Sequence, residues 1–157
     1  MTHGRTFTID RIGPRDLAKM NAMLTLFGEV FGESETYSER RPPAPYLEKL
    51  LAGDSFIALA AVEDGEIIGG LAGYELRKFE QQRSEIYIYD LAVAEPHRRR
   101  GVASALIAAL QPIAAERGAW VIYVQADHGD EPAIALYTKV GIREDVLHFD
   151  IAVERAR

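Results

Sequence analysis

The dipeptide Asp64-Gly65 lies between two apolar runs, and it constrains the fold of this 157-residue chain more than any other local feature. A two-residue Asp-Gly loop is typical of a β-hairpin turn, because both residues tolerate a positive φ. We therefore expect antiparallel strands over 55–62 and 67–76. A third strand is expected over 84–93, after a polar connection. The centre of the chain is predicted to be a largely antiparallel sheet.

The flanking segments alternate between strand and helix patterns. Apolar residues at steps of three and four follow Pro14 and predict a helix that runs through Phe31. Pro112 falls inside another predicted helix, where an interior proline costs ~3 kcal/mol and should cause a kink. Together the patterns predict a single α/β domain over 1–157, with a central, mostly antiparallel mixed sheet and helices on both faces. The remaining expected elements are strands over 6–12, 119–124 (buried) and 146–153, helices over 46–52, 103–117 and 130–139, and a loop over 32–45.

Composition excludes several classes of site. The chain has no cysteine, which removes disulfides, thiolate zinc sites and cysteine nucleophiles and suits the reducing cytoplasm, where we expect the protein. The four histidines show no metal-ligand spacing, so we expect no metal site. No signal segment or membrane-length apolar run is evident. The net charge of −6 argues against nucleic-acid or anionic-membrane binding and suits a cationic partner.

The junction between the third strand and the following helix carries the clearest functional pattern. The strand stops at Pro96, three arginines and Gly101 follow, and the helix then begins. Backbone N–H groups at a helix start favour an anion, and arginines add charge-assisted hydrogen bonds. The segment is neither a P-loop nor the glycine-rich turn of dinucleotide-binding proteins. The residues alone leave two interpretations open, a phosphate site and a solvated basic turn that caps the helix.

Two spaced motifs resemble the signatures of the GNAT superfamily of N-acetyltransferases. Arg98-x-x-Gly101-x-Ala103 resembles the Q/R-x-x-G-x-G/A motif at the expected strand-to-helix junction. Further stretches resemble the class I aminoglycoside 3-N-acetyltransferases (the gentamicin acetyltransferases), namely 56–61, 78–81, 84–93, 121–127, 135–144 and 148–151. The second superfamily motif, N-x-x-A-x-x-L-Y-x-x-x-G-F/I, is matched by Asp130 (where asparagine is usual), Ala133, Leu136, Tyr137, Gly141 and Ile142.

This resemblance implies an acetyl-coenzyme A-dependent enzyme that acetylates the 3-amino group of an aminoglycoside antibiotic and so confers resistance. It implies direct attack of the amine in a ternary complex. Backbone amides over 99–104 are expected to hold the pyrophosphate, and the strand edge over 91–93 to pair with the pantetheine arm, which requires the sheet to splay between 86–93 and 119–124. An N–H near Ala92 or Val93 would polarise the thioester carbonyl. The expected coenzyme A-binding residues are Leu91, Ala92, Val93, Arg98, Arg99, Arg100, Gly101, Val102, Ala103 and Ser104.

Asp90 is the candidate base. An alkylamine is mostly protonated at pH 7, so its attack on a thioester needs a group that accepts a proton. In simple alternation Asp90 shares a face with Ile86 and Ile88, and apolar neighbours raise the pKa of a carboxyl. A β-bulge near Asp90 would instead turn its side chain to the other face of the sheet. The alternative is a strand-end aspartate that binds local amides, but the resemblance places a working aspartate at this position of Tyr-Asp-Leu-Ala-Val.

The resemblance also suggests that the Tyr137 hydroxyl protonates the coenzyme A sulfur, although a helical tyrosine can simply close a core edge.

Acidic residues in several loops predict a cation trap, that is, a negatively charged site that attracts a small polycationic acceptor. Other amine acceptors, such as a polyamine or a peptide N-terminus, and a non-catalytic coenzyme A-binding module stay open, as does a homodimer. The candidate acceptor-binding residues are Glu35, Tyr37, Glu80, Asp127, Asp130 and Asp150.

Overall fold

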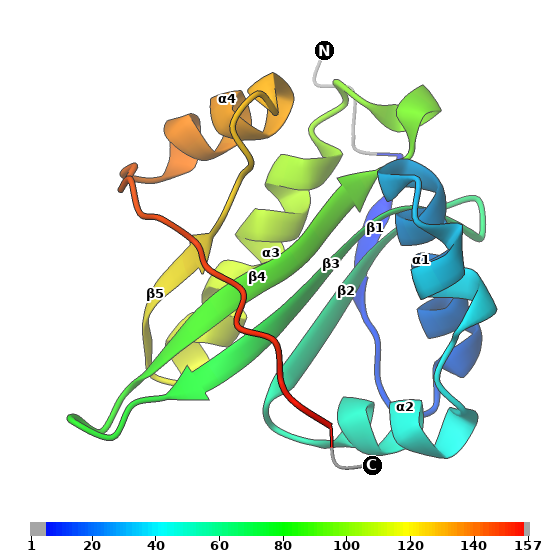
Figure 1. Ribbon diagram of the computed structural model, residues 1–157. Helices are drawn as coiled ribbons and strands as arrows, with labels where there is room; N and C mark the ends of the chain where they lie inside the picture. Colours follow the sequence, from blue (N-terminus) through cyan, green and yellow to red (C-terminus); the bar gives the residue numbers. More distant parts are fainter. Residues whose placement is uncertain (1–5, 156–157) are drawn as a thin grey trace. The chain divides into compact units, whose positions relative to one another are not determined.

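A computed structural model describes residues 6–155, which form two compact units that meet in sequence at Gln125 and Ala126. The first unit is built on a five-stranded sheet in the order β1-β2-β3-β4-β5 (Figure 1). Strands β1 to β4 pair antiparallel, and β5 pairs parallel with β4. The strands are β1 (Thr8–Arg11), β2 (Phe56–Glu63), β3 (Glu66–Arg77), β4 (Ser84–Val93) and β5 (Ala119–Val124).

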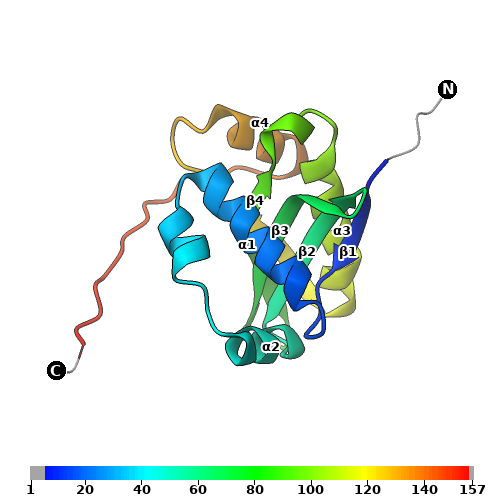
Figure 2. The same ribbon diagram turned by 90° about the vertical axis from the view of Figure 1, so that its right-hand side faces the viewer.

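Helices cover both faces of the sheet, as the sequence predicts. Helices α1 (Leu17–Phe31) and α2 (Ala44–Ala52) lie on one face, and α3 (Val102–Glu116) lies on the other (Figure 1 and Figure 2). A π-helical segment, η1 (Glu35–Glu39), follows α1, and a short 3₁₀ turn, η2 (Glu95–His97), follows β4. The second unit contains α4 (Glu131–Val140). The predicted α/β fold is confirmed.

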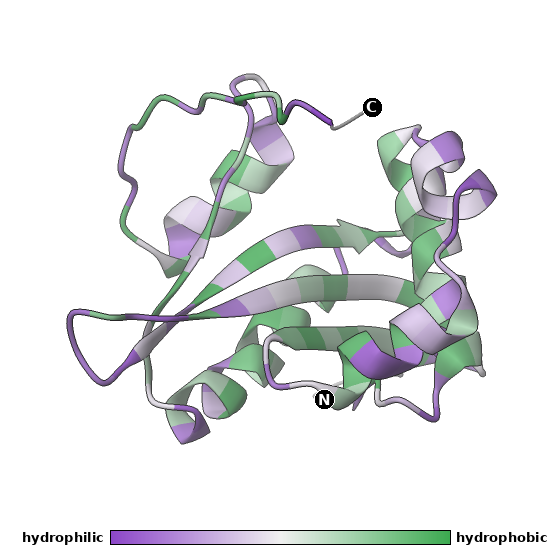
Figure 3. Cartoon of the chain, turned by 60° about the horizontal axis from the view of Figure 1, so that its bottom comes forward, coloured by the Kyte–Doolittle hydropathy of each residue, from purple (hydrophilic) through white to green (hydrophobic). Residues whose placement is uncertain are grey.

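The β2–β3 turn takes the form that its sequence predicts. Asp64 has φ 51° and Gly65 has φ 78°, so both residues of the turn adopt the left-handed conformation. This geometry matches the right-handed twist of the flanking strands. By contrast, hydrophilic residues gather in the longer connection between β3 and β4 (Figure 3).

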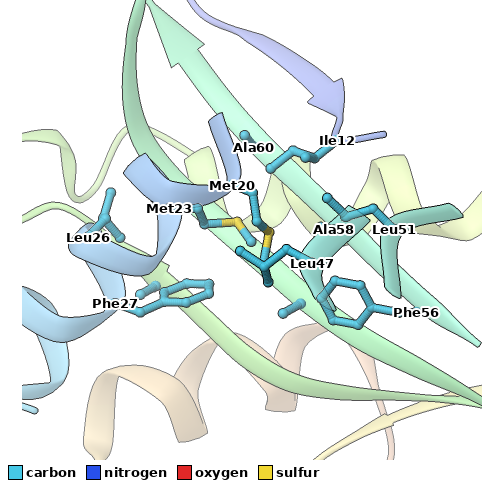
Figure 4. Close-up of a cluster of buried hydrophobic side chains, with 12 residues drawn as sticks. Ile12, Met20, Met23, Leu26, Phe27, Leu47, Leu51, Phe56, Ala58 and Ala60 are labelled. Carbon is cyan, nitrogen blue, oxygen red and sulfur yellow. The ribbon is translucent and has the colours of Figure 1, made fainter. Parts of the chain in front are cut away.

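The core under α1 depends on small residues in the strands. Met20, Met23 and Phe27 of α1 are almost fully buried. They pack over the strand residues Ala58 and Ala60, with Leu47 and Phe56 at the edge (Figure 4). Small strand side chains let the helix lie close to the sheet, because interiors are packed nearly without voids.

Two of the predicted strands differ from the structure. Strand β5 is not buried, because it ends the sheet and leaves Trp120 72% and Val121 46% exposed. No strand forms over 146–153, since the described part of the second unit offers no second strand to pair with it. Its apolar side chains therefore stay exposed, Phe149 by 78%. Pro112 lies inside α3, which continues to Glu116, and a kink at this position stays a prediction.

Gly70 on β3 provides a test of the close packing under α1. A Cβ at Gly70 would lie 2.6 Å from both Cγ and Sδ of Met23, which is fully buried. We expect Gly70→Ala to lower the free energy of unfolding by about 1–3 kcal/mol, because the core has no room for a methyl group. Gly53→Ala is the control, since a Cβ there meets nothing closer than 3.5 Å. Urea denaturation of both variants measures the difference, and equal stabilities would contradict this account of the core.

Candidate active site

A β-bulge in β4 sets the geometry of the site. Ala72 of β3 lies opposite Asp90, but the next residue, Gly73, lies opposite Ile88, so Tyr89 has no partner across the strand pair. Ala72 and Ala92 belong to the buried cluster under α1, and Asp90 faces the same side as its partner Ala72. The prediction that Asp90 shares a face with Ile86 and Ile88 is wrong, because the extra residue reverses the alternation.

On the α1 face, Asp90 meets Tyr37. The Tyr37 hydroxyl donates a hydrogen bond of 2.9 Å to Oδ2 of Asp90. Gly32, with φ 67°, ends α1 and turns the chain into η1, which carries Tyr37. The Tyr37 ring then packs at 6.0 Å from Phe27 and 5.8 Å from Phe31, measured between ring centroids. The fold thus holds this tyrosine rigidly against the carboxylate.

The surroundings make Asp90 a stronger base than a solvated carboxylate. Burial raises the pKa of Asp90, the hydrogen bond from Tyr37 opposes that rise, and the negative charge of Glu33 adds to it. Burial and the contact with Asp90 also raise the pKa of Tyr37, so its hydroxyl stays protonated as a donor at neutral pH. The pair can accept a proton at Asp90 while Tyr37 fixes the carboxylate in place.

Beyond the bulge, one edge of β4 has no strand neighbour. Pairing between β4 and β5 ends at Ile88 opposite Val124, whereas pairing between β4 and β3 continues to Val93 opposite Gly69. Figure 1 shows β4 continuing past the end of β5. The pairing thus stops where β5 itself ends, and a divergence of the two strands stays a prediction. Residues 89–93 offer an open backbone edge, which an extended ligand can pair with as an added strand.

The start of α3 has the features of an anion site. Arg99 has φ 62° and Gly101 has φ 76°, so the chain makes a tight turn before the helix. No side chain caps the helix, and its first backbone hydrogen bond runs from the N–H of Ala105 to the carbonyl of Gly101. The N–H groups over 102–104 precede that bond and point out of the helix end, where the dipole favours a negative charge.

The side chain of Arg100 holds this turn against the β2–β3 hairpin. Its guanidinium donates to Glu63 Oε1 at 3.2 Å, to Thr6 Oγ1 at 2.6 Å and to His97 Nδ1 at 2.7 Å. Hydrogen bonds from Arg100 and Thr6 lower the pKa of Glu63 to about 2. Arg100 therefore acts on this turn through its side chain, and sequence reasoning missed its partner Glu63, which lies 37 residues away.

The other arginines of the turn are placed differently. Arg98 donates from Nε to the carbonyl of Val93 at 3.3 Å, which ties the turn to the end of β4. Neither Arg98 nor Arg99 forms an ion pair within residues 6–155. These two cations are available for an anionic ligand at the start of α3.

The predicted acceptor residues of the first unit do not converge. Tyr37 reaches Asp90, but Glu35 pairs with Arg40 at 2.7 Å on the exposed side of η1. Glu80 pairs with Lys78 at 3.2 Å in the connection that precedes β4. That connection lies about 20 Å from Asp90 along the strand, at roughly 3.3 Å per residue. The structure does not bring Glu80 to Asp90.

The predicted site residues of the second unit have local roles within it. Oδ1 of Asp130 accepts a hydrogen bond of 3.3 Å from the backbone N–H of Ala133, so Asp130 caps α4. Tyr137 lies on α4, and partial burial followed by the charge of Asp130 raises its pKa to about 12. Its hydroxyl is therefore protonated at neutral pH and able to donate. Its role as the acid stays a prediction.

The remaining two predicted acceptor residues are exposed. Asp127 precedes α4, and its carbonyl accepts a hydrogen bond from the N–H of Asp130 at 3.2 Å. Asp150 lies 2.9 Å from Nε2 of His148. Their contact with an acceptor also stays a prediction. Among residues 6–155, no group of three or more His, Asp or Glu side chains could hold a metal ion.

Comparison with known proteins adds independent information. A profile of the acetyltransferase (GNAT) family matches residues 20–142. The crystal structure of an aminoglycoside acetyltransferase from an uncultured soil metagenomic sample has 58% sequence identity and a TM-score of 0.94, and covers 96% of this chain and 100% of that one. A second aminoglycoside acetyltransferase from such a sample, solved in complex with sisomicin, has 31% identity and a TM-score of 0.86 over 95% of this chain and 97% of that one.

A curated relative matches over a shorter region. Mycothiol acetyltransferase of Clavibacter sepedonicus is 37% identical over 90 residues, which are 56% of this chain. The chain spans 28% of the length of that relative. Within the described residues, no helix is both long and apolar enough to cross a membrane.

The groups around Asp90 predict opposite pH shifts for two variants. Tyr37→Phe removes the hydrogen bond that lowers the pKa of Asp90, so that pKa should rise and the acidic limb of kcat/KM should move to higher pH. Glu33→Gln removes a charge that raises the pKa, so the limb should move to lower pH. Initial rates of thiol release from acetyl-coenzyme A between pH 5 and pH 9 measure the acidic limb of each variant. Shifts in the same direction would contradict Asp90 as the group that titrates.

The turn before α3 predicts a selective loss of coenzyme A affinity. Gly101→Val forces a β-branched residue into φ 76° and places a side chain where the helix N–H groups meet a ligand. We expect the Kd for coenzyme A to rise about 10- to 100-fold, the weight of a lost charge-assisted hydrogen bond. Gly118→Val is the matched control, because Gly118 has φ 74° at the other end of the same helix. Calorimetry that finds equal Kd values for the two variants would rule out this site.

Proposed function

This chain belongs to the acetyltransferase (GNAT) family, and on that premise we propose that it transfers an acetyl group from acetyl-coenzyme A to an amine of an aminoglycoside. One observation carries the proposal. A half-buried carboxylate with a raised pKa, Asp90, is held by Tyr37 on a bulge beside the open edge of β4. The similarity to two aminoglycoside acetyltransferases, one of them in complex with sisomicin, supports an aminoglycoside as the acceptor.

Coenzyme A would lie across the start of α3 and the open edge of β4. The N–H groups over 102–104 bind the pyrophosphate, and the side chains of Arg98 and Arg99 add positive charge. The pantetheine arm pairs with the backbone over 91–93 as an added strand. This arrangement brings the thioester toward the bulge, where Asp90 lies on the α1 face of the same strand.

The chemistry starts with a protonated amine. Asp90 accepts the proton, directly or through a water molecule, and the neutral amine attacks the thioester carbonyl. A backbone N–H near Ala92 or Val93 stabilises the oxyanion that forms. The carbon–sulfur bond then breaks, and the hydroxyl of Tyr137 gives its proton to the departing sulfur. The nitrogen loses its second proton as the amide forms, and that proton restores the Tyr137 hydroxyl, directly or through a water molecule. Both substrates are bound together, so no acyl-enzyme forms.

We further propose the 3-amino group as the site of transfer, on the resemblance to the class I aminoglycoside 3-N-acetyltransferases. The net charge of −6 supports a polycationic acceptor, because an acidic protein raises the local concentration of cations. Incubation with gentamicin and acetyl-coenzyme A, followed by mass spectrometry and NMR of the product, tests both the acceptor and the nitrogen. Acetylation of a polyamine or a peptide, without acetylation of gentamicin, would show that the acceptor is not an aminoglycoside.

Asp90→Asn is the sharpest test of the mechanism. The variant keeps size and shape but loses the basic oxygen, so we expect kcat to fall by roughly 10²–10⁴-fold where chemistry limits turnover. The residual rate should climb with pH toward the pKa of the acceptor amine, because only amine already neutral in solution can react. Steady-state kinetics across pH measures both effects.

Asp64→Asn in the β2–β3 turn is the control for this variant. It removes the same charge from the chain, and asparagine tolerates the positive φ of Asp64. It should leave kcat and its pH dependence unchanged. If Asp90→Asn raises the acceptor KM with kcat unchanged, Asp90 only attracts the cation and the base is another group.

A further inference from the structure

An aromatic row lies beside Asp90 on the face of the sheet that α1 covers. The ring centroids of Tyr74 and Tyr89 lie 5.8 Å apart, and those of Tyr89 and Tyr87 also lie 5.8 Å apart. Tyr87 stacks on Tyr123 at 4.7 Å, with an interplanar angle of 7°. We call these four side chains, Tyr74, Tyr89, Tyr87 and Tyr123, the tyrosine row. It crosses strands β3, β4 and β5 next to Asp90.

The row is anchored at one end and open in the middle. Tyr74 packs against buried Phe56 at 5.2 Å between centroids. Tyr89, by contrast, is 60% exposed. The Tyr87 hydroxyl donates to Oε1 of Gln125 at 3.0 Å, so the polar rim of the row is ordered as well.

The chemistry of this face differs from that of the opposite face of the same strand. On the α3 side, β4 presents Ile86 and Ile88, both almost fully buried. On the α1 side, it presents tyrosines, which combine an apolar ring with a polar tip. Burial raises the pKa of Tyr87 and Tyr123, so their hydroxyls stay neutral at physiological pH. A partly wet face of rigid aromatic rings is suited to a ligand that is apolar on one side and polar at its edges.

We propose that the tyrosine row is the floor on which the ring system of the acceptor lies, and that Tyr89 is the residue that selects acceptors with more than one ring. This inference rests on the proposed function. Sugar rings present C–H groups that pack on aromatic faces, and their ammonium groups are attracted to the same rings. Three neighbouring strands at about 4.8 Å spacing give a floor on the order of 10–15 Å wide, which exceeds a single six-membered ring.

The row also explains how the acceptor is aligned with the base. Asp90 directly follows Tyr89 in the strand, so the amine nearest that ring lies next to the carboxylate. The negative charge of Asp90 and the rings of the row attract the same cationic ligand. A single-ring amine at Asp90 would cover only a part of the row, whereas a multi-ring acceptor would use its whole width.

Two variants of Tyr89 separate the ring from the hydroxyl. Tyr89→Leu removes the aromatic ring, and we expect the KM for gentamicin to rise about three- to tenfold while the KM for acetyl-coenzyme A is unchanged. Tyr89→Phe keeps the ring and should stay within twofold of the parent protein. With 2-deoxystreptamine, a single-ring amine that covers less of the row, Tyr89→Leu should raise the KM by a smaller factor than with gentamicin. The kcat for gentamicin should stay close to that of the parent, which shows that the bulge still holds Asp90 in place.

Trp120→Leu is the control for loss of an exposed aromatic. Trp120 is 72% exposed and lies near the start of β5, where it packs under Arg83 and not against a tyrosine of the row. It should leave the gentamicin KM unchanged. The proposal is overturned if Tyr89→Leu leaves the gentamicin KM unchanged. It is also overturned if Tyr89→Leu raises the KM for gentamicin and for 2-deoxystreptamine by the same factor, or if Tyr89→Phe raises the gentamicin KM as much as Tyr89→Leu does.

The outcome is separable from that of the proposed function. If the parent protein does not acetylate any aminoglycoside, the proposed function fails and the row has no such ligand. If the parent acetylates gentamicin but Tyr89→Leu behaves as the parent, the function stands and the floor is elsewhere. Calorimetric titration of gentamicin into the parent and Tyr89→Leu proteins, without acetyl-coenzyme A, measures the same difference independently of turnover.

Discussion

The extra residue in β4 is the constraint on which the site depends. Tyr89 interrupts the register with β3, and from that point the strand presents its side chains to the opposite faces. Asp90 thereby reaches Tyr37 of η1 and leaves the aliphatic side occupied by Ile88. The pairing with β5 stops at the same place, because β5 ends at Val124, so the carboxylate and the open backbone edge lie side by side on β4. The proposed base and the proposed coenzyme A edge therefore belong to a single strand.

A second constraint joins segments that are distant in the sequence. Arg100 in the turn before α3 is bonded to Glu63 at the end of β2, and Tyr37 after α1 is bonded to Asp90. Both contacts fix loops against the sheet at the end where β4 leaves β5. The loops that surround a reaction centre are often mobile, but here each is held by a charge or a hydroxyl at a defined atom.

The sequence predicts regular elements well and their exceptions poorly. Apolar periodicity and the Asp64-Gly65 turn place most helices and strands within a few residues of their observed ends. Alternation cannot locate the bulge at Tyr89, because an inserted residue leaves the pattern of Ile86 and Ile88 intact. It also predicts a strand over 146–153, although a strand needs a neighbour that pattern alone does not supply. The two motifs identify the family, but long-range partners such as Glu63 leave no local signal.

The parallel pairing of β4 with β5 has a consequence for how the molecule folds and opens. Strands β2, β3 and β4 are sequential neighbours joined by short connections, so they can assemble early from local contacts. Strand β5 joins only after α3 has crossed the sheet, and it pairs with β4 through the register from Ser84 to Ile88. We therefore expect β5, which lies at an edge of the sheet, to detach before the central strands in local unfolding. The proposed coenzyme A channel borders this strand, so the channel can widen at a smaller free energy than that of global unfolding.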